Sequence, residues 1–368
     1  MSDQVVKVLH VAPGFLYGGI EKRLVDWYSL MDRTRIRFDI VKVTPDKPNP
    51  LVDRIREFGG NVYSIPSLGA KTMCAHFDQM RRIIQNGNYK VIHSHGLSYG
   101  YYPLKIGQRI GIEKRILHSR TTDHNPGERQ IWIKELLAHR AMGYATDYFA
   151  CSKEAGEFAF RGKHSFRVID NGIFLEEYTF DHDKRQKKRR ELGLDGSFVL
   201  GYVGRLSPPK NIPMLFEVFG RMYSSLPTTK LLVVGSIDDD KVVYEEAIRI
   251  ASRYNALGNV IFAGRQDSIT PWLNVMDVFL MPSHFEGFGT VAIEAQANGL
   301  PCLLSEAVPK STCVSESVKY LPFEVGKWVE EVQLLRNKER HAGDIKRIAD
   351  AGFDVRLTAK WLQDFYMA

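Results

Sequence analysis

Short apolar segments alternate with longer segments of helical periodicity along almost the whole chain. In the first half, the strand-length runs are Val5 to Ala12, Phe38 to Val43, Asn61 to Ile65, Lys90 to His93, Arg115 to His118 and Asp147 to Ala150. Helical patterns lie between them, for example at Ile20 to Met31 and Glu128 to Met142. This alternation predicts a parallel sheet covered by helices.

The same alternation begins again after Phe166 to Ile173 and a highly charged segment, Asp181 to Glu191. The second set of strands is predicted at Phe198 to Val203, Lys230 to Val234, Val260 to Phe262, Val278 to Met281, Pro301 to Leu304 and Val318 to Leu321. Two successive sheets predict an α/β protein with two doubly wound, Rossmann-like domains facing across a cleft, and a ligand at the carboxyl ends of the strands. We expect residues 1–180 and 181–352 to form the two domains.

Composition narrows the class of protein. The chain has 368 residues, of which 44% are hydrophobic and 25% charged, and four scattered cysteines without metal-ligand spacing. This cysteine usage predicts a reduced, cytoplasmic protein. No apolar run approaches the ~20 residues of a membrane-spanning helix. The net charge of +7 suits anionic substrates or an anionic inner-leaflet surface, whereas no module typical of nucleic-acid binding is present.

The most informative segment follows the apolar run Val278 to Met281. Gly287 and Gly289 permit a tight turn before an alanine-rich helix that begins near Thr290. A strand, a glycine turn and a helix N-terminus together predict an anion site. Two carboxylates, Glu286 and Glu294, flank this site and suit hydroxyl groups, so the pattern indicates a ligand with a phosphate centre and hydroxyl-rich ends, such as a nucleotide-sugar.

This segment, Glu-Gly-Phe-Gly-Thr-Val-Ala-Ile-Glu-Ala, resembles the paired-glutamate motif of retaining family 4 glycosyltransferases with the GT-B fold. The resemblance implies that Glu286 holds the hydroxyls of the donor sugar and Glu294 holds the ribose. Gly287, Phe288 and Gly289 would lie against the donor. It also implies transfer of a hexose from a nucleotide-sugar to an acceptor hydroxyl of a lipid-linked saccharide in the synthesis of bacterial surface or exopolysaccharide. A last helix, Phe353 to Tyr366, would cross back to the first domain.

Two cations follow the first strand of the second half. Arg205 and Lys210 lie in Gly-Arg-Leu-Ser-Pro-Pro-Lys-Asn, which is similar to the family's pattern at this place. A leaving nucleoside diphosphate accumulates negative charge as the sugar bond breaks, and two fixed cations would stabilise that charge. Solvated loop cations are the alternative.

Three further donor-binding candidates depend more heavily on the resemblance. Gly18 and Gly19 follow the first strand and open a helix, where family members meet phosphates or the acceptor, although a plain tight turn would look the same. Arg265 ends a strand near which relatives hold the nucleobase, and a surface arginine is equally plausible there. The full GxGxxG pattern is missing, which disfavours a dinucleotide oxidoreductase.

Histidines follow two strands of the first half. The family presents a histidine near the transferred sugar, and His118 occupies that place here, with His124 as a competitor. Many relatives carry a second histidine where this chain has Arg120. Because His93 and His95 alternate on a predicted strand, we expect them to point to opposite faces and not to share an ion. No metal or other cofactor is therefore expected.

Basic segments define possible acceptor or membrane surfaces. Six basic residues lie in Lys184 to Arg190, which we interpret as a solvated helix face or as a contact with anionic lipid. Lys114 and Arg115, with the aromatic cluster Tyr99 to Tyr102, would add to an acceptor surface.

Two functions are alternatives to glycosyl transfer. One is a GT-B nucleotide-sugar 2-epimerase or phosphorylase, and the other is a catalytically inactive sugar-nucleotide-binding protein.

Overall fold

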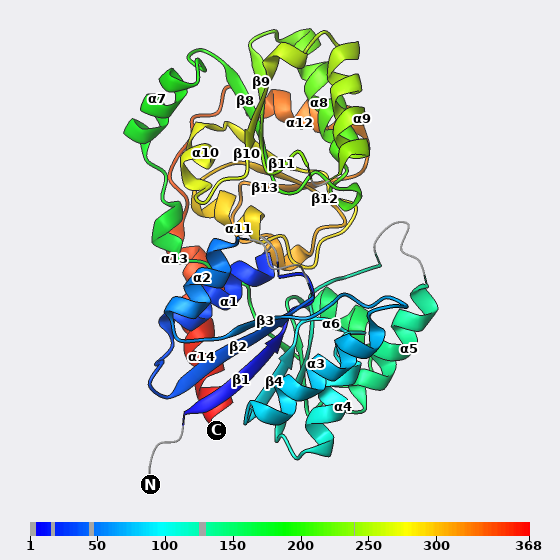
Figure 1. Ribbon diagram of the computed structural model, residues 1–368. Coiled ribbons are helices and arrows are strands. Elements are labelled where there is room, and N and C mark those ends of the chain that lie inside the picture. Colours follow the sequence, from blue (N-terminus) through cyan, green and yellow to red (C-terminus); the bar gives the residue numbers. More distant parts are fainter. Residues whose placement is uncertain (1–4, 16–18, 44–47, 125–129, 239) are drawn as a thin grey trace. The chain divides into compact units, whose positions relative to one another are not determined.

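A computed structural model describes residues 5–15, 19–43, 48–124, 130–238 and 240–368. The chain forms two compact units (Figure 1). Unit 1 comprises Met1–Gly172 and Asp354–Ala368, and unit 2 comprises Ile173–Phe353. The division falls at residues 172/173, earlier than the sequence-based boundary at 180/181, because the intervening residues already pack within unit 2: the Ile173 N–H donates to the Phe353 carbonyl (2.8 Å).

The sheet of unit 1 has seven parallel strands in the order β3-β2-β1-β4-β5-β6-β7. The strands are β1 (Val6–Val11), β2 (Ile36–Lys42), β3 (Val62–Ser64), β4 (Val91–Ser94), β5 (Lys114–Ser119), β6 (Asp147–Ala150) and β7 (Arg167–Val168). The helices are α1 (Gly19–Leu30), α2 (Pro50–Glu57), α3 (Met73–Asn86), α4 (Tyr101–Arg109), α5 (Ile131–Met142), α6 (Lys153–Phe160) and α14 (Val355–Met367).

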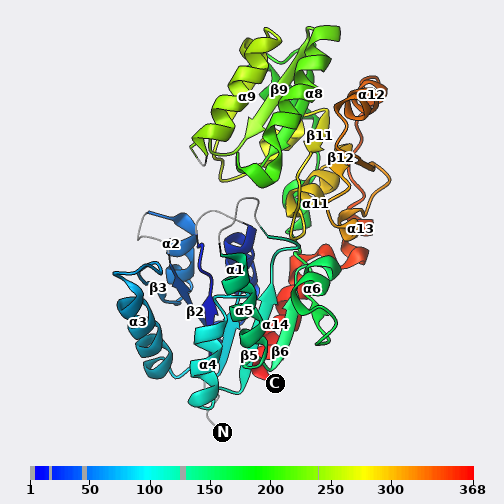
Figure 2. The same cartoon turned by 90° about the vertical axis from the view of Figure 1, so that its right-hand side faces the viewer.

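Helices cover both faces of this sheet (Figure 2). Helices α1 and α14 pack against each other, and α3, α4 and α5 contact one another in sequence. Neighbouring residues of β4 show the two faces: His93 contacts Tyr366 of α14, whereas Ile92 lies against Gly107 of α4. The last helix of the chain is therefore part of the first unit.

The sheet of unit 2 has six parallel strands in the order β10-β9-β8-β11-β12-β13. The strands are β8 (Phe198–Val203), β9 (Thr229–Val234), β10 (Val260–Gly264), β11 (Val278–Met281), β12 (Cys302–Ser305) and β13 (Val318–Leu321). The helices are α7 (His182–Glu191), α8 (Ile212–Ser225), α9 (Lys241–Arg253), α10 (Thr270–Val275), α11 (Thr290–Ala297), α12 (Val325–Leu335) and α13 (Ile345–Ile348). Its core combines Tyr202, Phe216, Phe219 and Trp328.

The prediction of two parallel-sheet, Rossmann-like domains is confirmed. Buried strands are short apolar runs, and four of them, β6, β8, β11 and β13, have the predicted bounds. The segment Phe166 to Ile173 contributes only the short strand β7, because the chain leaves the sheet after Val168 and the Gly172 carbonyl accepts a hydrogen bond from Arg23 of α1. No helix in the described part of the chain is both long and apolar enough to cross a membrane.

Candidate functional site

The order of strands in unit 2 identifies where a ligand would bind. Strand β8 lies between β9 and β11, so the chain continues to opposite sides of β8, and the carboxyl ends of β8 and β11 are the switch point at which ligands of such sheets bind. The loop after β8 carries Arg205 and Lys210, and the loop after β11 carries Glu286. The predicted donor-site residues are therefore distributed over the two strands that form the switch point of unit 2.

Lys210 and Glu286 meet at this switch point. The Lys210 ammonium donates to Glu286 Oε1 at 2.5 Å, and the Ser283 hydroxyl donates to the same oxygen at 2.8 Å. The His284 N–H donates to the Pro209 carbonyl at 2.7 Å, which joins the two loops. Glu286 is only 8% exposed. A fixed ammonium and a fixed carboxylate thus lie side by side, as recognition of a phosphate next to a sugar hydroxyl requires.

The second glutamate lies on α11, in a buried position. Gly289 precedes this helix with φ +90°, a conformation that glycine adopts without strain. Glu294 is 4% exposed, and its Oε1 accepts a hydrogen bond from the Tyr178 hydroxyl at 2.8 Å. Sequence reasoning missed Tyr178 and Ser283, because neither hydroxyl belongs to a recognisable motif.

Neighbouring strand ends approach each other closely beside this site. A Cβ atom on Gly235, after β9, would lie 1.9 Å from the Gly204 carbonyl oxygen, after β8. The Gly235 N–H donates to the Gly264 carbonyl, at the end of β10, at 2.9 Å. Only glycine at position 235 permits this approach, so the carboxyl edge of unit 2 presents tightly packed backbone next to Lys210.

The remaining donor-binding candidates have different environments. Arg205 and Arg265 are exposed, at the ends of β8 and β10. Phe288 is 3% exposed and its ring packs on Phe353, so a donor contact of Phe288 would have to come from its backbone. Gly19 begins α1 in unit 1 with open space beside its Cα, and Gly18 lies outside the described residues.

Unit 1 holds a second polar cluster, at the carboxyl ends of β1, β4 and β5. We call His10, His93, His95, His118 and Arg120 the histidine–arginine cluster. Strand β1 lies between β2 and β4, so this cluster lies at the switch point of the first sheet. All four histidines are buried, with at most 5% exposure, and Arg120 is half-buried.

The prediction that His93 and His95 point to opposite faces is wrong. Their rings stack with centroids 4.2 Å apart, and one ligand atom from each of His10, His93 and His95 lies within 4.8 Å of the others. Residues two apart in an extended strand lie on the same face, so the alternation of β4 itself places His95 on the side of His93. The geometric argument against a shared ion therefore fails.

Electrostatics gives a better argument on the metal. Arg120 lies 3.2 Å from Nδ1 of His95, and His95 Nε2 lies 3.0 Å from His10 Nδ1. A divalent ion would have to displace the His10–His95 hydrogen bond next to a guanidinium cation, which opposes its binding. Chemistry without a protein-bound metal remains a prediction.

Burial keeps these histidines neutral. Desolvation, followed by the charge of Arg120, lowers the pKa of His10 to about 3. Desolvation also lowers the pKa of His93, His95 and His118 well below the usual value, with neighbouring histidines and Arg120 contributing. Burial lowers the pKa of Arg120 to about 10, so the guanidinium remains the charged member of the cluster at neutral pH.

The two competing site histidines lie in different surroundings. His118 belongs to the cluster, where its Nδ1 lies 2.9 Å from Nε2 of His93. His124 lies 3.4 Å from Glu135 of α5 and packs edge-on against Phe158. Only His118 lies at the switch point of unit 1.

Several cations proposed as surface contacts have internal partners. Lys114 donates to the Phe365 carbonyl at 2.7 Å, and Arg115 donates to the Tyr144 carbonyl at 2.7 Å. On α7, Arg185 and Arg189 bind Asp277, with side chains only 15% and 11% exposed. The interpretation of Lys184 to Arg190 as a solvated face is therefore wrong for these two arginines, which attach α7 to unit 2.

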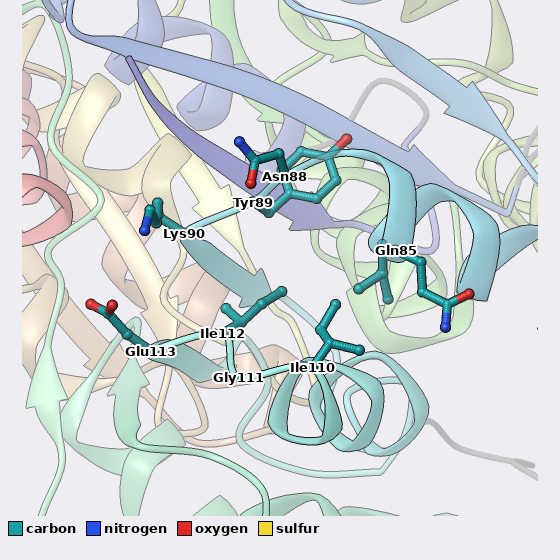
Figure 3. Close-up of a pocket in the computed structure, with 9 residues that line it drawn as sticks. Gln85, Asn88, Tyr89, Lys90, Ile110, Gly111, Ile112 and Glu113 are labelled. Atoms are coloured by element: carbon teal, nitrogen blue, oxygen red, sulfur yellow. The ribbon is translucent and has the colours of Figure 1, made fainter. Parts of the chain in front are cut away.

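A cavity of about 350 Å³ lies at the opposite edge of the first sheet (Figure 3). Its lining includes Tyr89 and Lys90 before β4, and Ile112 and Glu113 before β5. These are the amino ends of the strands, whereas ligands of open α/β sheets bind at the carboxyl ends. We therefore do not assign the cavity to the candidate site.

Comparison with known proteins agrees with this geometry. Residues 184–326 match the family model for glycosyl transferases group 1. The chain is 28% identical to the putative glycosyltransferase EpsF of Bacillus subtilis (strain 168) over 84% of this chain and 81% of EpsF. It is 23% identical to the UDP-Gal:alpha-D-GlcNAc-diphosphoundecaprenol alpha-1,3-galactosyltransferase of Escherichia coli over 82% of this chain and 79% of that protein.

Solved structures extend the likeness to the whole fold. Anabaena HepE, in complex with UDP and glucose, superposes with a TM-score of 0.80 at 20% identity, covering 98% of this chain and 99% of HepE. The lipopolysaccharide glycosyltransferase WaaG gives a TM-score of 0.68 at 14% identity, covering 98% of this chain and 95% of WaaG. Unit 2 therefore contains a segment that matches the glycosyl transferases group 1 model, and the chain as a whole has the fold of solved GT-B glycosyltransferases.

Proposed function

We propose that this glycosyltransferase moves a hexose from a UDP-sugar to a saccharide hydroxyl, with retention of the anomeric configuration, as a family 4 enzyme does. The adjacent Lys210 ammonium and Glu286 carboxylate carry the proposal. In a nucleotide-sugar, the diphosphate and the sugar hydroxyls are likewise adjacent, joined through the anomeric carbon. HepE was solved with UDP, glucose and UDP-glucose, which supports UDP as the nucleotide.

Each site residue then has a physical role in the proposed reaction. Glu286, oriented by Ser283, accepts hydrogen bonds from sugar hydroxyls, and Glu294, oriented by Tyr178, holds the ribose. Lys210 and Arg205 stabilise the charge that develops on the departing diphosphate. That diphosphate takes the acceptor's proton on the same face of the sugar, so the leaving bond and the new bond share one face.

Relatives support a saccharide acceptor in surface-polysaccharide assembly. The E. coli relative is a galactosyltransferase that acts on a diphosphoundecaprenol-linked sugar. CapH of Staphylococcus aureus, a capsular polysaccharide biosynthesis glycosyltransferase, is 24% identical over 99% of both chains. We extend this class of lipid-linked acceptor to the present chain, acting on the cytoplasmic side of a membrane.

The products of a defined incubation test the reaction. The chain is mixed with UDP-glucose or UDP-galactose, with and without a lipid-linked N-acetylhexosamine acceptor, and the products are analysed by NMR. We expect an α-linked product from the α-configured donor. A β-linked product would exclude retention, epimerised sugar without acceptor would favour the epimerase, and UDP-sugar binding without transfer would favour an inactive binding protein.

Helix α5 provides the best surface for attachment to an anionic membrane. Its sequence is apolar on most sides, yet only Ala141 and Met142 are buried within it. Trp132 and Leu136 are 69% and 44% exposed. Exposed tryptophan and leucine next to the exposed basic residues His139 and Arg140 fit an interfacial helix at an anionic lipid surface.

Vesicle binding tests this surface. We expect the chain to cosediment with phosphatidylglycerol vesicles more than with phosphatidylcholine vesicles, and Trp132→Ser to weaken that binding several-fold. Val242→Ser removes an apolar residue that is 72% exposed on α9 and serves as the matched control. Equal binding of the two variants to the vesicles would contradict the proposal that α5 binds lipid. A dimer of the unmodified chain that Trp132→Ser dissociates would contradict it as well.

A further inference from the structure

Arg120 is a charged residue whose partners in the described structure are all neutral. Its guanidinium donates to Asn171 Oδ1 at 2.9 Å and to Nδ1 of His95 at 3.2 Å, and lies over the Trp27 ring at 5.4 Å. Among the described residues no carboxylate makes a direct hydrogen bond to it, although the charge of the buried Glu21 acts on Arg120 and raises its pKa against the effect of burial. A half-buried cation usually has an anionic partner, because removal from water is otherwise costly.

The directions of the hydrogen bonds next to Arg120 follow from its chemistry. Arginine only donates, so Nδ1 of His95 accepts and the proton of this neutral imidazole is on Nε2. That proton is donated to His10 Nδ1 at 3.0 Å, which leaves the proton of His10 on Nε2. Within the described part of the chain, His10 Nε2 is buried and has no hydrogen-bond partner.

A second chain of hydrogen bonds ends in the same way. The Tyr366 hydroxyl lies 2.7 Å from His93 Nδ1, and His93 Nε2 lies 2.9 Å from His118 Nδ1. If the hydroxyl donates, the buried tyrosine proton is satisfied and His118 carries its proton on Nε2. The opposite direction would leave both the tyrosine proton and His118 Nε2 without partners in the described structure, at a cost of about 1–3 kcal/mol for each group.

The cluster therefore has more donors than acceptors. Buried nitrogen atoms without a described partner are His10 Nε2, His118 Nε2, Arg120 Nε and Trp27 Nε1, and with these proton positions all four carry a hydrogen. A positive charge surrounded by unmatched N–H groups is complementary to a group with several acceptor oxygens and a negative charge. Arg120 is the least buried member of the cluster and follows the carboxyl end of β5, at the edge where ligands bind.

We propose that Arg120 binds a carboxylate or phosphate group of the acceptor saccharide, with His95, Asn171 and Trp27 holding its guanidinium in place. This inference rests on the proposed function, because it describes the acceptor of that same transfer. A planar guanidinium binds two oxygens of one anion at once, which a histidine at this position would not do. The chain would accordingly prefer an acidic saccharide over a neutral one.

Binding measurements on the full chain test the proposal without requiring turnover. The affinities of glucuronate, glucose 6-phosphate and glucose are measured by calorimetry with UDP present at saturation, so that the diphosphate site of unit 2 is occupied. We expect at least one acid to bind the unmodified chain at least tenfold more tightly than glucose, and the acid that binds identifies the group. Arg120→Gln should lose that preference, and Arg120→Lys should keep part of it. Arg109→Gln, an exposed arginine on α4 of the same unit, is the control and should keep it fully.

Two further measurements distinguish a failure of the proposed function from a failure of the proposed role of Arg120. UDP affinity measured on the same samples should be unchanged in Arg120→Gln, which shows that unit 2 is folded, and an unchanged circular dichroism spectrum and thermal melting curve show the same for unit 1. If the unmodified chain binds no UDP, the proposed function fails, whereas UDP binding without a preference for either acid overturns only the role of Arg120. Imidazole ¹⁵N spectra should show His10 and His95 shifting when the acid binds; unchanged spectra would indicate that buried waters alone occupy the cluster, and would also overturn the proposal.

Discussion

Single hydroxyl groups orient the two glutamates of the candidate donor site. Ser283 donates to Glu286, and Tyr178 donates to Glu294. Such a bond fixes the direction of the carboxylate. The Tyr178 contact was not predictable, because Tyr178 and Glu294 are separated by 116 residues and only the fold brings them together. The glutamates themselves were found from the sequence, because their turn and helix form one local motif.

Removing the Tyr178 hydroxyl should weaken donor binding specifically. We expect Tyr178→Phe to raise the dissociation constant for a UDP-sugar about three- to tenfold, the equivalent of one lost hydrogen bond. Tyr254→Phe, whose hydroxyl donates to Glu217 at 2.9 Å on the α8–α9 side of unit 2, is the matched control. Calorimetric titration of both variants measures the effect, and identical affinities would remove Tyr178 from the site.

Helix α7 was predicted as a helix, but the contacts of its basic residues were not predicted. A dense run of positive charge predicts a solvated helix, and α7 is indeed helical from His182 to Glu191. However, Arg189 donates to the carbonyls of Val275 and Leu194 and binds Asp277, which also accepts from the Val199 N–H of β8. The charge pattern of a helix does not reveal which of its cations point into the protein, because such cations bind backbone carbonyl groups, which every residue carries.

Stability measurements distinguish the inward and outward cations of α7. Arg189→Met should lower the free energy of unfolding of unit 2 by ~3 kcal/mol, because it leaves a partly buried Asp277 without this partner. Arg190→Met changes an exposed neighbour and should stay within about 0.5 kcal/mol. Urea denaturation followed by fluorescence gives both values. A similar small effect of the two substitutions would contradict the attachment of α7 through Arg189.

At the scale of the whole molecule, the sequence predicted both sheets because buried parallel strands are continuous apolar runs. It did not predict the histidine–arginine cluster, since the contact of His10 with His95 depends on the pairing of β1 with β4. The cluster also makes stability depend on pH. Its histidines are neutral in the folded protein, whereas the unfolded chain binds protons below pH ~6.5.

The free energy of unfolding of unit 1 should therefore fall as the pH falls below about 6.5, by up to ~1.4 kcal/mol per pH unit for each buried histidine. His10, with a folded pKa of about 3, stays neutral through this window. Denaturation at pH 7.5, 6.5 and 5.5 measures the slope, which His10→Gln should reduce. His182→Gln, which changes a side chain that is 68% exposed at the start of α7, should leave it unchanged. A pH-independent stability of unit 1 over this range would contradict neutral buried histidines.

In the proposed reaction, Lys210, beside Glu286, stabilises the diphosphate that departs during transfer. The most direct test of this role is the turnover number of Lys210→Ala at saturating UDP-sugar, with Lys319→Ala as control, because Lys319 pairs with Glu331 elsewhere in unit 2. We predict that kcat falls ~100-fold or more for Lys210→Ala, well beyond any change in donor affinity, and stays unchanged for the control. An unchanged kcat for Lys210→Ala would contradict the claim.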